Sequence, residues 1–325
     1  MAAPASIAPT LEEIRAAHEL LLPHIVRTPL IRFNGPGGSK QIFLKLENLQ
    51  PIGSFKVRPM GNAMLTVDRR KLRDGVYTAS SGNSGLGVAW MAAKLGVAAR
   101  VYVPESAPAG KLQAIAVAGA SVHELSEDAW WDVIRRRGHP DESGFFVDAV
   151  RDTAAMAGNG TIGLEIFKDL PEVDTVVVPF GGGGVVCGIA SLIRALKPDT
   201  RIIVAECDAA AALTGAFRAG RPVRVPHRQT FISGAGASIV LDEMWPLASG
   251  LVDATSVVSE DEVADAIGQL FASNRIVAEG AGALSVAAAI SDAGITGTIV
   301  CVVTGGNIDP VLFCKLLHRL QVNGA

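Results

Sequence analysis

The sequence predicts an α/β protein built on two open, mainly parallel sheets with helices on both faces. Short apolar runs rich in β-branched residues alternate with Ala-rich helical stretches along almost the whole chain of 325 residues. Most of these runs are followed by glycines or a cap and then by a helix, which is typical of parallel strands joined by crossover helices. The hydrophobic content of 49% is enough to bury a large core.

The first element is a helix that we expect from Thr10 to Leu22. Thr10 and Glu13 have the spacing of a capping box, and Pro23 ends the helix. The clearest strands are six apolar runs, at residues 42–46, 75–79, 99–103, 175–179, 201–206 and 297–303.

The chain has the length of two domains that share one cleft. Residues 47–140 hold their own alternation of strands and helices, and residues 144–148 then return to a new strand. We therefore predict a small domain of residues 47–140 inserted in a large domain of residues 1–46 and 141–325.

Composition excludes several classes of function. The formal net charge is −3 and 19% of residues are charged, so no basic face suits nucleic acid and no polybasic tract suits a membrane. No apolar run reaches membrane-spanning length, and residues 1–7 lack the pattern of a secretory signal. We expect a cytoplasmic protein that acts on a small molecule.

Four cysteines are widely spaced among mostly apolar neighbours. They are Cys187, Cys207, Cys301 and Cys314. This pattern predicts reduced, buried thiols and neither a zinc site nor a disulfide framework.

Lys56 follows a strand in the frame Gly-Ser-Phe-Lys. A lysine amine that is partly removed from water can lose its proton near neutral pH and form a Schiff base with an aldehyde. Lys56 is therefore a candidate covalent anchor, although a lone lysine at the start of a helix is more often a surface residue.

Three polar or glycine-rich turns also follow strands. Residues 80–84 precede a helix that we expect to begin near Val88, and their N–H groups and hydroxyls suit a carboxylate. Residues 181–184 are four glycines, which let the backbone approach a phosphate closely. They lack the spacing of a nucleotide-binding or dinucleotide-binding motif. Residues 304–307 follow the last strand. Because such carboxyl ends meet at one edge of a sheet, we expect one ligand site.

In this order and spacing, the motifs Gly-Ser-Phe-Lys, Ser-Gly-Asn, Gly-Gly-Gly-Gly and Thr-Gly-Gly-Asn resemble one family over nearly the whole chain. It is that of the fold-type II pyridoxal-phosphate enzymes, in particular the serine/threonine dehydratase and serine racemase group. Residues 160–166 add to the likeness. The resemblance implies a fold like that of the tryptophan synthase β subunit, pyridoxal 5′-phosphate as cofactor, and a homodimer.

The resemblance also implies a role for each site residue. Lys56 would hold the cofactor and remove the α-proton of the substrate, and Phe55 would lie against the cofactor ring. Asn83 would bind the 3′-oxygen, and Thr304 would face the pyridine nitrogen. The phosphate would be surrounded by Gly181, Gly182, Gly183, Gly184 and Val185, and the substrate carboxylate would be bound by Ser80, Ser81, Gly82 and Ser84.

The expected reaction is β-elimination, in which a β-hydroxy amino acid is dehydrated and deaminated to a 2-oxo acid and ammonia. The hydroxyl of Thr304 cannot protonate the pyridine nitrogen as a carboxylic acid would, and this favours elimination over transamination. Because the chain ends soon after residue 307 and one further helix, we expect no amino-acid-sensing domain and a degradative role.

Three departures from the family pattern concern the substrate pocket. Ser84 replaces a histidine of many dehydratases, residues 233–238 replace an Ala-Asp-Gly segment, and Trp130 and Trp131 stand where racemases have polar residues and arginine. Drift explains them as well as a pocket reshaped for a bulkier substrate such as phenylserine.

Other activities remain as alternatives. Lys56 and Ser81 on opposite faces of the cofactor would make a serine racemase. A 3-hydroxyaspartate ammonia-lyase needs a cation that the sequence does not place. A β-replacement enzyme and a non-catalytic cofactor-binding protein are further possibilities.

We predict no metal ligands, although relatives often bind a divalent cation after the strand that ends here at Glu206. The chain continues with Cys207 and Asp208 and then alanines, so the second carboxylate is shifted or missing. A divalent or monovalent cation stays an open question, with Glu206 and Glu279 as candidate ligands.

Overall fold

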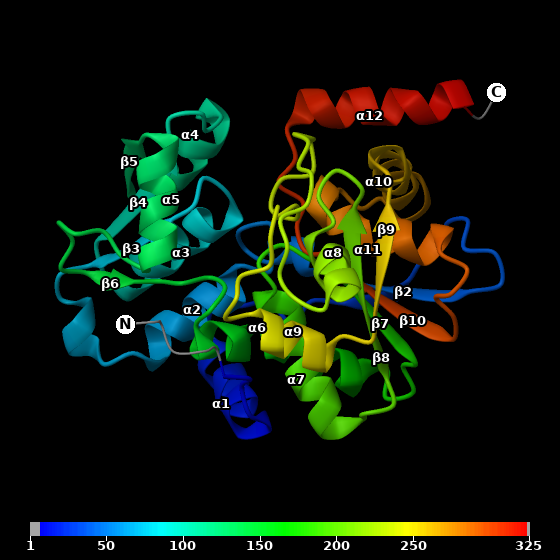
Figure 1. Ribbon diagram of the computed structural model, residues 1–325, viewed down its shortest axis with the longest axis horizontal. Helices are drawn as coiled ribbons and strands as arrows, with labels where there is room; N and C mark the ends of the chain where they lie inside the picture. The colour runs from blue at the N-terminus through cyan, green and yellow to red at the C-terminus, as the bar shows by residue number, and fades with distance from the viewer. Residues whose placement is uncertain (1–6, 324–325) are drawn as a thin grey trace.

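The computed structural model describes residues 7–323. It contains one six-stranded and one four-stranded sheet, and Figure 1 shows them in separate halves of the molecule with the smaller sheet on the left. Nearly all neighbouring strands are parallel. The predicted α/β class with two open, mainly parallel sheets is confirmed.

The large sheet has the order β1-β2-β10-β7-β8-β9. Only β1 runs antiparallel to its neighbour. The strands are β1 (Leu30–Arg32), β2 (Gln41–Lys45), β7 (Thr175–Pro179), β8 (Arg201–Cys207), β9 (Ala254–Val258) and β10 (Thr298–Val302).

The small sheet has the order β5-β4-β3-β6 and is parallel throughout. Its strands are β3 (Val76–Ala79), β4 (Ala99–Pro104), β5 (Ser121–Leu125) and β6 (Phe145–Phe146). Because β6 pairs with β3, this sheet extends past residue 140, where the sequence places the end of the small domain. The division into residues 1–46, 47–140 and 141–325 stays a prediction.

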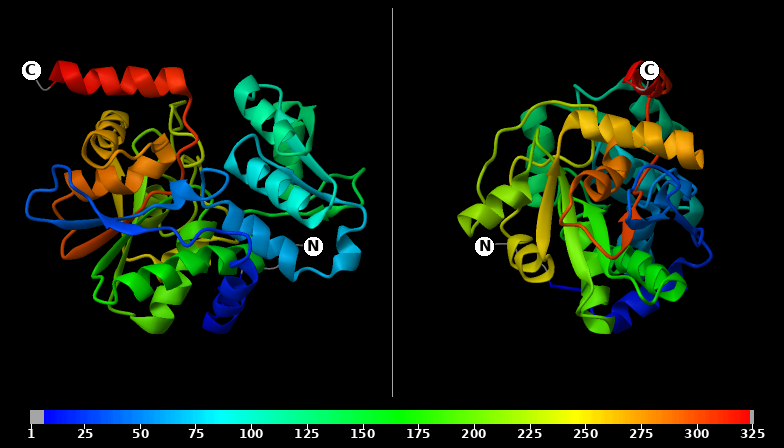
Figure 2. Two further views of the ribbon diagram at one scale, coloured as in Figure 1. Left: turned by 180° about the vertical axis from the view of Figure 1, so that it is seen from behind. Right: turned by 90° about the vertical axis from the view of Figure 1, so that its right-hand side faces the viewer.

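The helices connect the strands and cover both sheets (Figure 2). They are α1 (Leu11–Leu21), α2 (Val57–Thr66), α3 (Asn83–Leu95), α4 (Ala109–Val117), α5 (Glu127–Arg136), α6 (Thr153–Asp169), α7 (Gly184–Leu196), α8 (Ala212–Ala219), α9 (Trp245–Leu251), α10 (Glu260–Asn274), α11 (Gly280–Ser291) and α12 (Pro310–Asn323). Two short 3₁₀ turns are η1 (Glu47–Leu49) and η2 (Arg69–Leu72). Among the described residues, no helix is both long and apolar enough to cross a bilayer.

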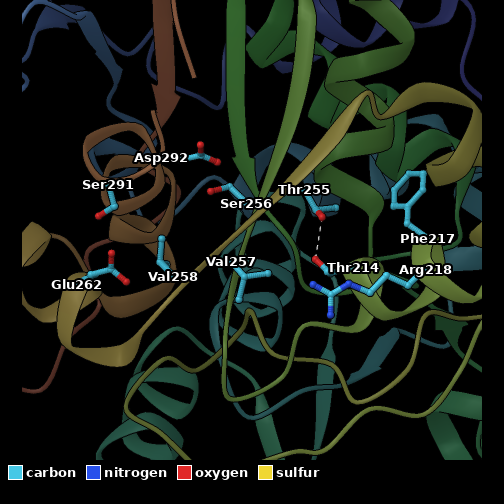
Figure 3. A pocket seen from close by; sticks show the side chains of 10 residues that line it. All are labelled: Thr214, Phe217, Arg218, Thr255, Ser256, Val257, Val258, Glu262, Ser291 and Asp292. Carbon is cyan, nitrogen blue, oxygen red and sulfur yellow. Dashed lines mark hydrogen bonds between the residues drawn. The ribbon is translucent and has the colours of Figure 1, made fainter. Parts of the chain in front are cut away.

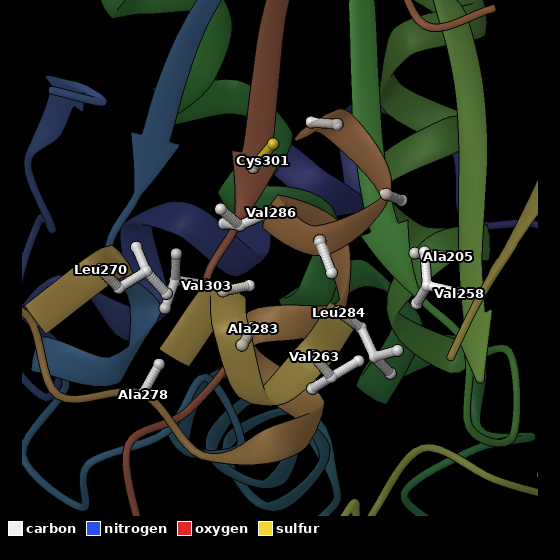
Figure 4. Packing of buried hydrophobic residues seen from close by; sticks show 14 of the residues in the cluster. Ala205, Val258, Val263, Leu270, Ala278, Ala283, Leu284, Val286, Cys301 and Val303 are labelled. Carbon is white, nitrogen blue, oxygen red and sulfur yellow. The ribbon is translucent and has the colours of Figure 1, made fainter. Parts of the chain in front are cut away.

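The central strands of the large sheet, β7, β8 and β10, are buried on both faces because they are apolar at most positions. In β7, Val176 and Val178 belong to one core cluster together with residues of α6 and α7, such as Ile189. Val177 points the other way and belongs to a second cluster with α10 and α11, part of which Figure 4 shows around Leu284. Successive residues of a strand face opposite sides, so continuous apolar runs produce this sandwich.

The start of α1 follows the predicted capping box. The Thr10 hydroxyl accepts a hydrogen bond from Glu13 N, and the Glu13 carboxylate accepts one from Thr10 N at 2.8 Å. The helix ends at Leu21, just before Pro23. This local prediction is confirmed because its donors and acceptors lie within four residues of one another.

Two local predictions are wrong. Helix α3 begins at Asn83 and not near Val88. The glycines that favoured a turn are needed inside the helix: a Cβ atom at Gly85 would lie 2.5 Å from the carbonyl oxygen of Ser80. All four cysteines are free, as predicted, but Cys314 is exposed, because it lies on a face of α12 that the rest of the chain does not cover.

Candidate active site

Lys56 lies at the N-cap of α2, beside the turn that follows β10. An isolated bridge pairs Ser54 with Gly305, and Phe55 N donates to the Thr304 carbonyl at 3.0 Å. These backbone contacts bring the Gly-Ser-Phe-Lys frame against the Thr304 turn, although about 250 residues separate them in the sequence.

The Lys56 amine is in an environment that favours its neutral form. Burial lowers its pKa to about 8, against the opposing attraction of Glu279 and Asp148. The Nζ atom lies 4.8 Å from the centroid of the Phe55 ring. A lysine with a pKa this close to neutrality can act as a nucleophile and as a general base.

Residues 181–185 form a cup of backbone donors at the N-terminus of α7. None of their N–H groups donates a hydrogen bond within the part of the chain that the structure describes. The glycines are also packed tightly from behind, since a Cβ atom would lie 2.5 Å from Gly234 O at Gly181 and 2.6 Å from a Val150 methyl at Gly182. Buried or half-buried N–H groups without acceptors at a helix N-terminus fit a phosphate dianion.

Residues 80–84 lie at the start of α3. Ser80 N donates to the Tyr102 carbonyl, and Gly82 N donates to the Ser80 hydroxyl at 3.2 Å. The N–H groups of Asn83 and Ser84 and the Ser81 hydroxyl have no hydrogen bond among the described residues. This helix start can therefore receive a carboxylate.

Asn83 is held between two other side chains. Its Nδ2 donates to Glu279 Oε1 at 2.7 Å, and its Oδ1 accepts from Asn307 Nδ2 at 2.8 Å. Burial raises the pKa of Glu279 to about 7, although its bond with Asn83 and the charges of Lys111 and Lys56 act against this rise.

Glu279 and Asn307 have no assigned role in the sequence prediction. The sequence indicates Glu279 only as a candidate metal ligand, and Asn307 only as part of the Thr-Gly-Gly-Asn motif. The one sequence signal for Glu279 is a single acid between alanines and glycines, and it cannot show that Asn83 is its partner.

Lys111 also faces the site and was missed, because nothing distinguishes it from other lysines of a helix. It lies on α4, and its Nζ donates to the Ser233 hydroxyl at 2.9 Å. Ser233 belongs to the segment 233–238 that departs from the family pattern, and the next residue, Gly234, contacts Gly181. Within the described chain the Lys111 ammonium forms no ion pair with a carboxylate at salt-bridge distance.

The two tryptophans of α5 differ in their relation to the site. Trp130 is half-buried, and its Nε1 donates at 3.1 Å to the Tyr102 carbonyl, which also accepts from Ser80 N. Trp131 is 45% exposed and bonds to Glu127. Only Trp130 lies next to residues 80–84.

A buried ion cluster supports α2, the helix that Lys56 begins. The Arg58 guanidinium bonds to Glu47 at 2.7 and 2.8 Å and to Glu165 at 2.8 and 2.9 Å. Lys45 Nζ bonds to Glu165 at 2.5 Å. The side chains are 0–2% exposed, so the cluster joins β2, η1, α2 and α6 in the interior.

The residues around Glu206 do not fit a cation. Both oxygens of this buried carboxylate accept hydrogen bonds from the start of α8: Oε1 from Leu213 N at 2.8 Å, and Oε2 from Thr214 N at 2.8 Å and the Thr214 hydroxyl at 2.7 Å. Among the described residues, no three potential metal-binding side chains lie close enough together to hold an ion. A hard cation needs several free oxygen ligands. Here the oxygens of Glu206 are not free, because they accept hydrogen bonds from the start of α8.

A separate surface hollow of about 450 Å³ lies beside β9. Figure 3 shows Thr214 and Thr255 joined by a hydrogen bond in its wall, with Arg218 close by. None of its lining residues belongs to the turns described above, so it is not the candidate active site.

Comparison with known proteins identifies the family. A family model described as "Pyridoxal-phosphate dependent enzyme" matches residues 21–305. The chain belongs to this family. The pyridoxal-phosphate enzymes most similar to it include L-threonine ammonia-lyase of Geobacter sulfurreducens, 38% identical over 314 residues, which are 94% of this chain and 77% of that protein.

Two further proteins match this chain over nearly their whole length. The catabolic L-threonine dehydratase TdcB of Escherichia coli K12 is 34% identical over 307 residues, which are 92% of this chain and 93% of that protein. The structure of maize serine racemase matches with a TM-score of 0.88 and 29% identity, covering 98% of this chain and 100% of that one. The predicted family, the threonine dehydratase and serine racemase group, is confirmed.

As a member of this family the protein uses pyridoxal 5′-phosphate, and its own residues fit that cofactor. The unpartnered N–H groups of residues 181–185 suit the phosphate, and the Lys56 amine suits the aldehyde. Asn83 Nδ2 lies close to Gly305 of the Thr304 turn, and Phe55 N of the Lys56 frame bonds to the Thr304 carbonyl. The role of each site residue stays a prediction.

Proposed function

We propose that the protein is a pyridoxal-phosphate-dependent ammonia-lyase that converts a β-hydroxy amino acid to a 2-oxo acid and ammonia. The observation that carries the proposal is that the chain combines a half-buried Lys56 amine, whose pKa burial lowers to about 8, with a cup of N–H groups that have no acceptor among the described residues. The relatives named L-threonine ammonia-lyase and L-threonine dehydratase support the same chemistry.

The chain's residues have distinct tasks in this reaction. When bound, pyridoxal phosphate draws electrons away from the substrate's α-carbon. Residues 80–84 hold the substrate carboxylate, and the Lys56 amine takes the α-proton as the Cα–H bond breaks. The Cβ–O bond then breaks, and the hydroxyl leaves with a proton as water. The released enamine becomes an imine, which takes up water to give the 2-oxo acid and ammonia.

The serine racemase alternative needs an acid/base on the face opposite Lys56. The Ser81 hydroxyl has no hydrogen-bonded base among the described residues. An isolated serine hydroxyl is a weak proton carrier, because its pKa lies far from neutrality. This observation favours elimination over racemisation.

For the substrate we propose a β-hydroxy amino acid with a bulky side chain, such as phenylserine. Trp130 supplies aromatic surface next to residues 80–84, the turn proposed to bind the carboxylate. Its Nε1 donates to the Tyr102 carbonyl, which also accepts from Ser80 N. A second candidate is 3-hydroxyaspartate. The cation that this substrate requires would be Lys111, whose ammonium bonds, among residues 7–323, only to the neutral hydroxyl of Ser233.

One experiment tests both the reaction and the substrate. The purified protein with bound cofactor is incubated with threonine, serine, phenylserine and 3-hydroxyaspartate, and ammonia, 2-oxo acid and D-isomer are measured. We expect ammonia and 2-oxo acid in equal amounts, with the highest kcat/KM for phenylserine. Lys56→Ala should abolish turnover, and Lys71→Ala, at an exposed lysine of η2, should not.

Other outcomes contradict specific parts of the proposal. Predominant D-isomer would support the racemase, and a cofactor absorption band without ammonia from any substrate would support a non-catalytic binding protein. Activity confined to threonine and serine would reject the bulky substrate. If 3-hydroxyaspartate is preferred and Lys111→Met removes that preference, the second candidate is correct.

The remaining parts of the proposal concern the cellular setting. We propose a cytoplasmic homodimer with a role in amino-acid degradation, as expected from the sequence and the family. Analytical ultracentrifugation of the protein with its cofactor tests the dimer, and a monomer at micromolar concentration would contradict it.

A further inference from the structure

Asn83 has two hydrogen-bonded neighbours that determine which way its amide points. Asn307 Nδ2 donates to the Ile52 carbonyl at 2.9 Å as well as to Asn83 Oδ1 at 2.8 Å. A backbone carbonyl can only accept, so the Asn307 nitrogen must face Ile52, and the Asn83 atom beside it must be the oxygen. The nitrogen of Asn83 therefore points to Glu279.

Glu279 completes this arrangement from the other side. An ionised carboxylate can only accept, and its Oε1 lies 2.7 Å from Asn83 Nδ2. The Asn83 amide has two N–H groups, and Glu279 uses one of them. The second has no hydrogen-bond partner among the described residues.

The surroundings of Glu279 hold its carboxyl group in place. The side chain is 8% exposed, and Glu279 N donates to the Gly305 carbonyl at 3.0 Å. A Cβ atom at Gly305 would lie 2.2 Å from Glu279 Oε1, so the glycine of the Thr304 turn leaves the space that the carboxyl group occupies. Lys56 and Lys111 are the charged groups that face it.

We propose that Glu279 is a positioning residue that orients the Asn83 amide, so that one N–H of Asn83 is presented to the 3′-oxygen of pyridoxal phosphate. The inference rests on the role proposed above for Asn83. Without an acceptor at position 279, Asn83 loses one of its two anchors, and its amide can turn away from the cofactor. Glu279 does not touch the reacting atoms in this scheme.

The test compares Glu279→Gln with Glu279→Leu. Glutamine removes the charge but keeps an oxygen that accepts from Asn83 Nδ2, whereas leucine fills the space without an acceptor. The readout is the Kd of the apoprotein for pyridoxal phosphate, followed by the visible absorption of the bound cofactor. We expect Glu279→Gln within about threefold of the wild type and Glu279→Leu weaker by about tenfold or more, because it loses a buried hydrogen bond.

A second variant covers the case in which leucine prevents folding. Asn307→Ala removes the other anchor of Asn83 and leaves Glu279 in place, and it should also weaken cofactor binding about tenfold. The proposal is overturned if glutamine weakens binding as much as leucine, or if a folded Glu279→Leu or Asn307→Ala variant binds the cofactor as tightly as the wild type. These affinities are measured without substrate, so they decide the inference even if the protein releases no ammonia.

Discussion

Replacing Arg58 with methionine should destabilise the protein strongly, because Arg58 is the centre of the buried ion cluster. The cluster balances two cations, Arg58 and Lys45, against two carboxylates, Glu47 and Glu165. Methionine has a similar length but no charge. The variant is left with one negative charge that has no partner in the interior.

The size of the effect follows from the burial of these groups. Arg58 and Glu47 are 0% exposed, and Glu165 is 2% exposed. Removing one partner of a buried ion pair costs about 3–5 kcal/mol in the free energy of unfolding. At about 2 °C per kcal/mol for a protein of this size, Tm should fall by about 6–10 °C.

Thermal unfolding followed by circular dichroism measures this difference. The matched control is Arg70→Met, because the Arg70 side chain is 79% exposed and its ion pair with Asp68 lies at the surface. We expect no change in Tm for the control. Because Arg58 lies two residues after Lys56 in the sequence, the Arg58 variant should also bind the cofactor more weakly than the control does.

The pH dependence provides a second check. Burial alone would raise the pKa of Glu47, but the charge and hydrogen bonds of Arg58 outweigh it and keep the pKa below its ordinary value. Ionised Glu47 therefore stabilises the wild type above the unfolded pKa, and this contribution is lost as pH falls through the folded pKa. Without Arg58, burial raises the pKa of Glu47, and protonation relieves the unpaired charge.

The difference in Tm between wild type and variant should therefore narrow as the solution is made acidic. An Arg58→Met protein within about 2 °C of the wild type at neutral pH would refute the reasoning. A difference that grows with acidity would refute it as well.

Three further predictions concern the cofactor and the cation. Gly181→Ala places a Cβ atom 2.5 Å from the Gly234 carbonyl oxygen, so the Kd for pyridoxal phosphate should rise about tenfold. The control Gly250→Ala has open space around its Cβ atom and should leave this Kd unchanged. The rate at which the apoprotein takes up cofactor should rise with pH and level off above the Lys56 pKa of about 8, and a constant rate through that range would contradict the role of the amine. EDTA should leave turnover and Tm unchanged, because both oxygens of the Glu206 carboxylate already accept hydrogen bonds from Leu213 and Thr214. If EDTA abolished turnover and magnesium restored it, this prediction would be wrong.

Much of the candidate site could be predicted from short segments of sequence. A strand followed by glycines and a helix produces unpartnered N–H groups through local backbone geometry, so residues 181–185 could be recognised without the fold. The capping box of Thr10 and Glu13 is equally local. The sequence predicts the wrong start for α3 because Gly85 and Gly87 suggest a turn, whereas close packing requires them within the helix.

The sequence by itself determined the α/β class, the family and the candidate anchor Lys56. The alternation of apolar runs with helical stretches, the residues of each turn and the order of the motifs can all be read along the chain. Only the tertiary structure decided that Glu279 and Asn307 hold Asn83 from both sides, and that Lys111 faces the site. It also decided that Arg58 and Lys45 together neutralise two buried carboxylates. These pairings join residues far apart in the chain. Their distances and burial fix the charge and orientation of each group, and no pattern along the sequence encodes them.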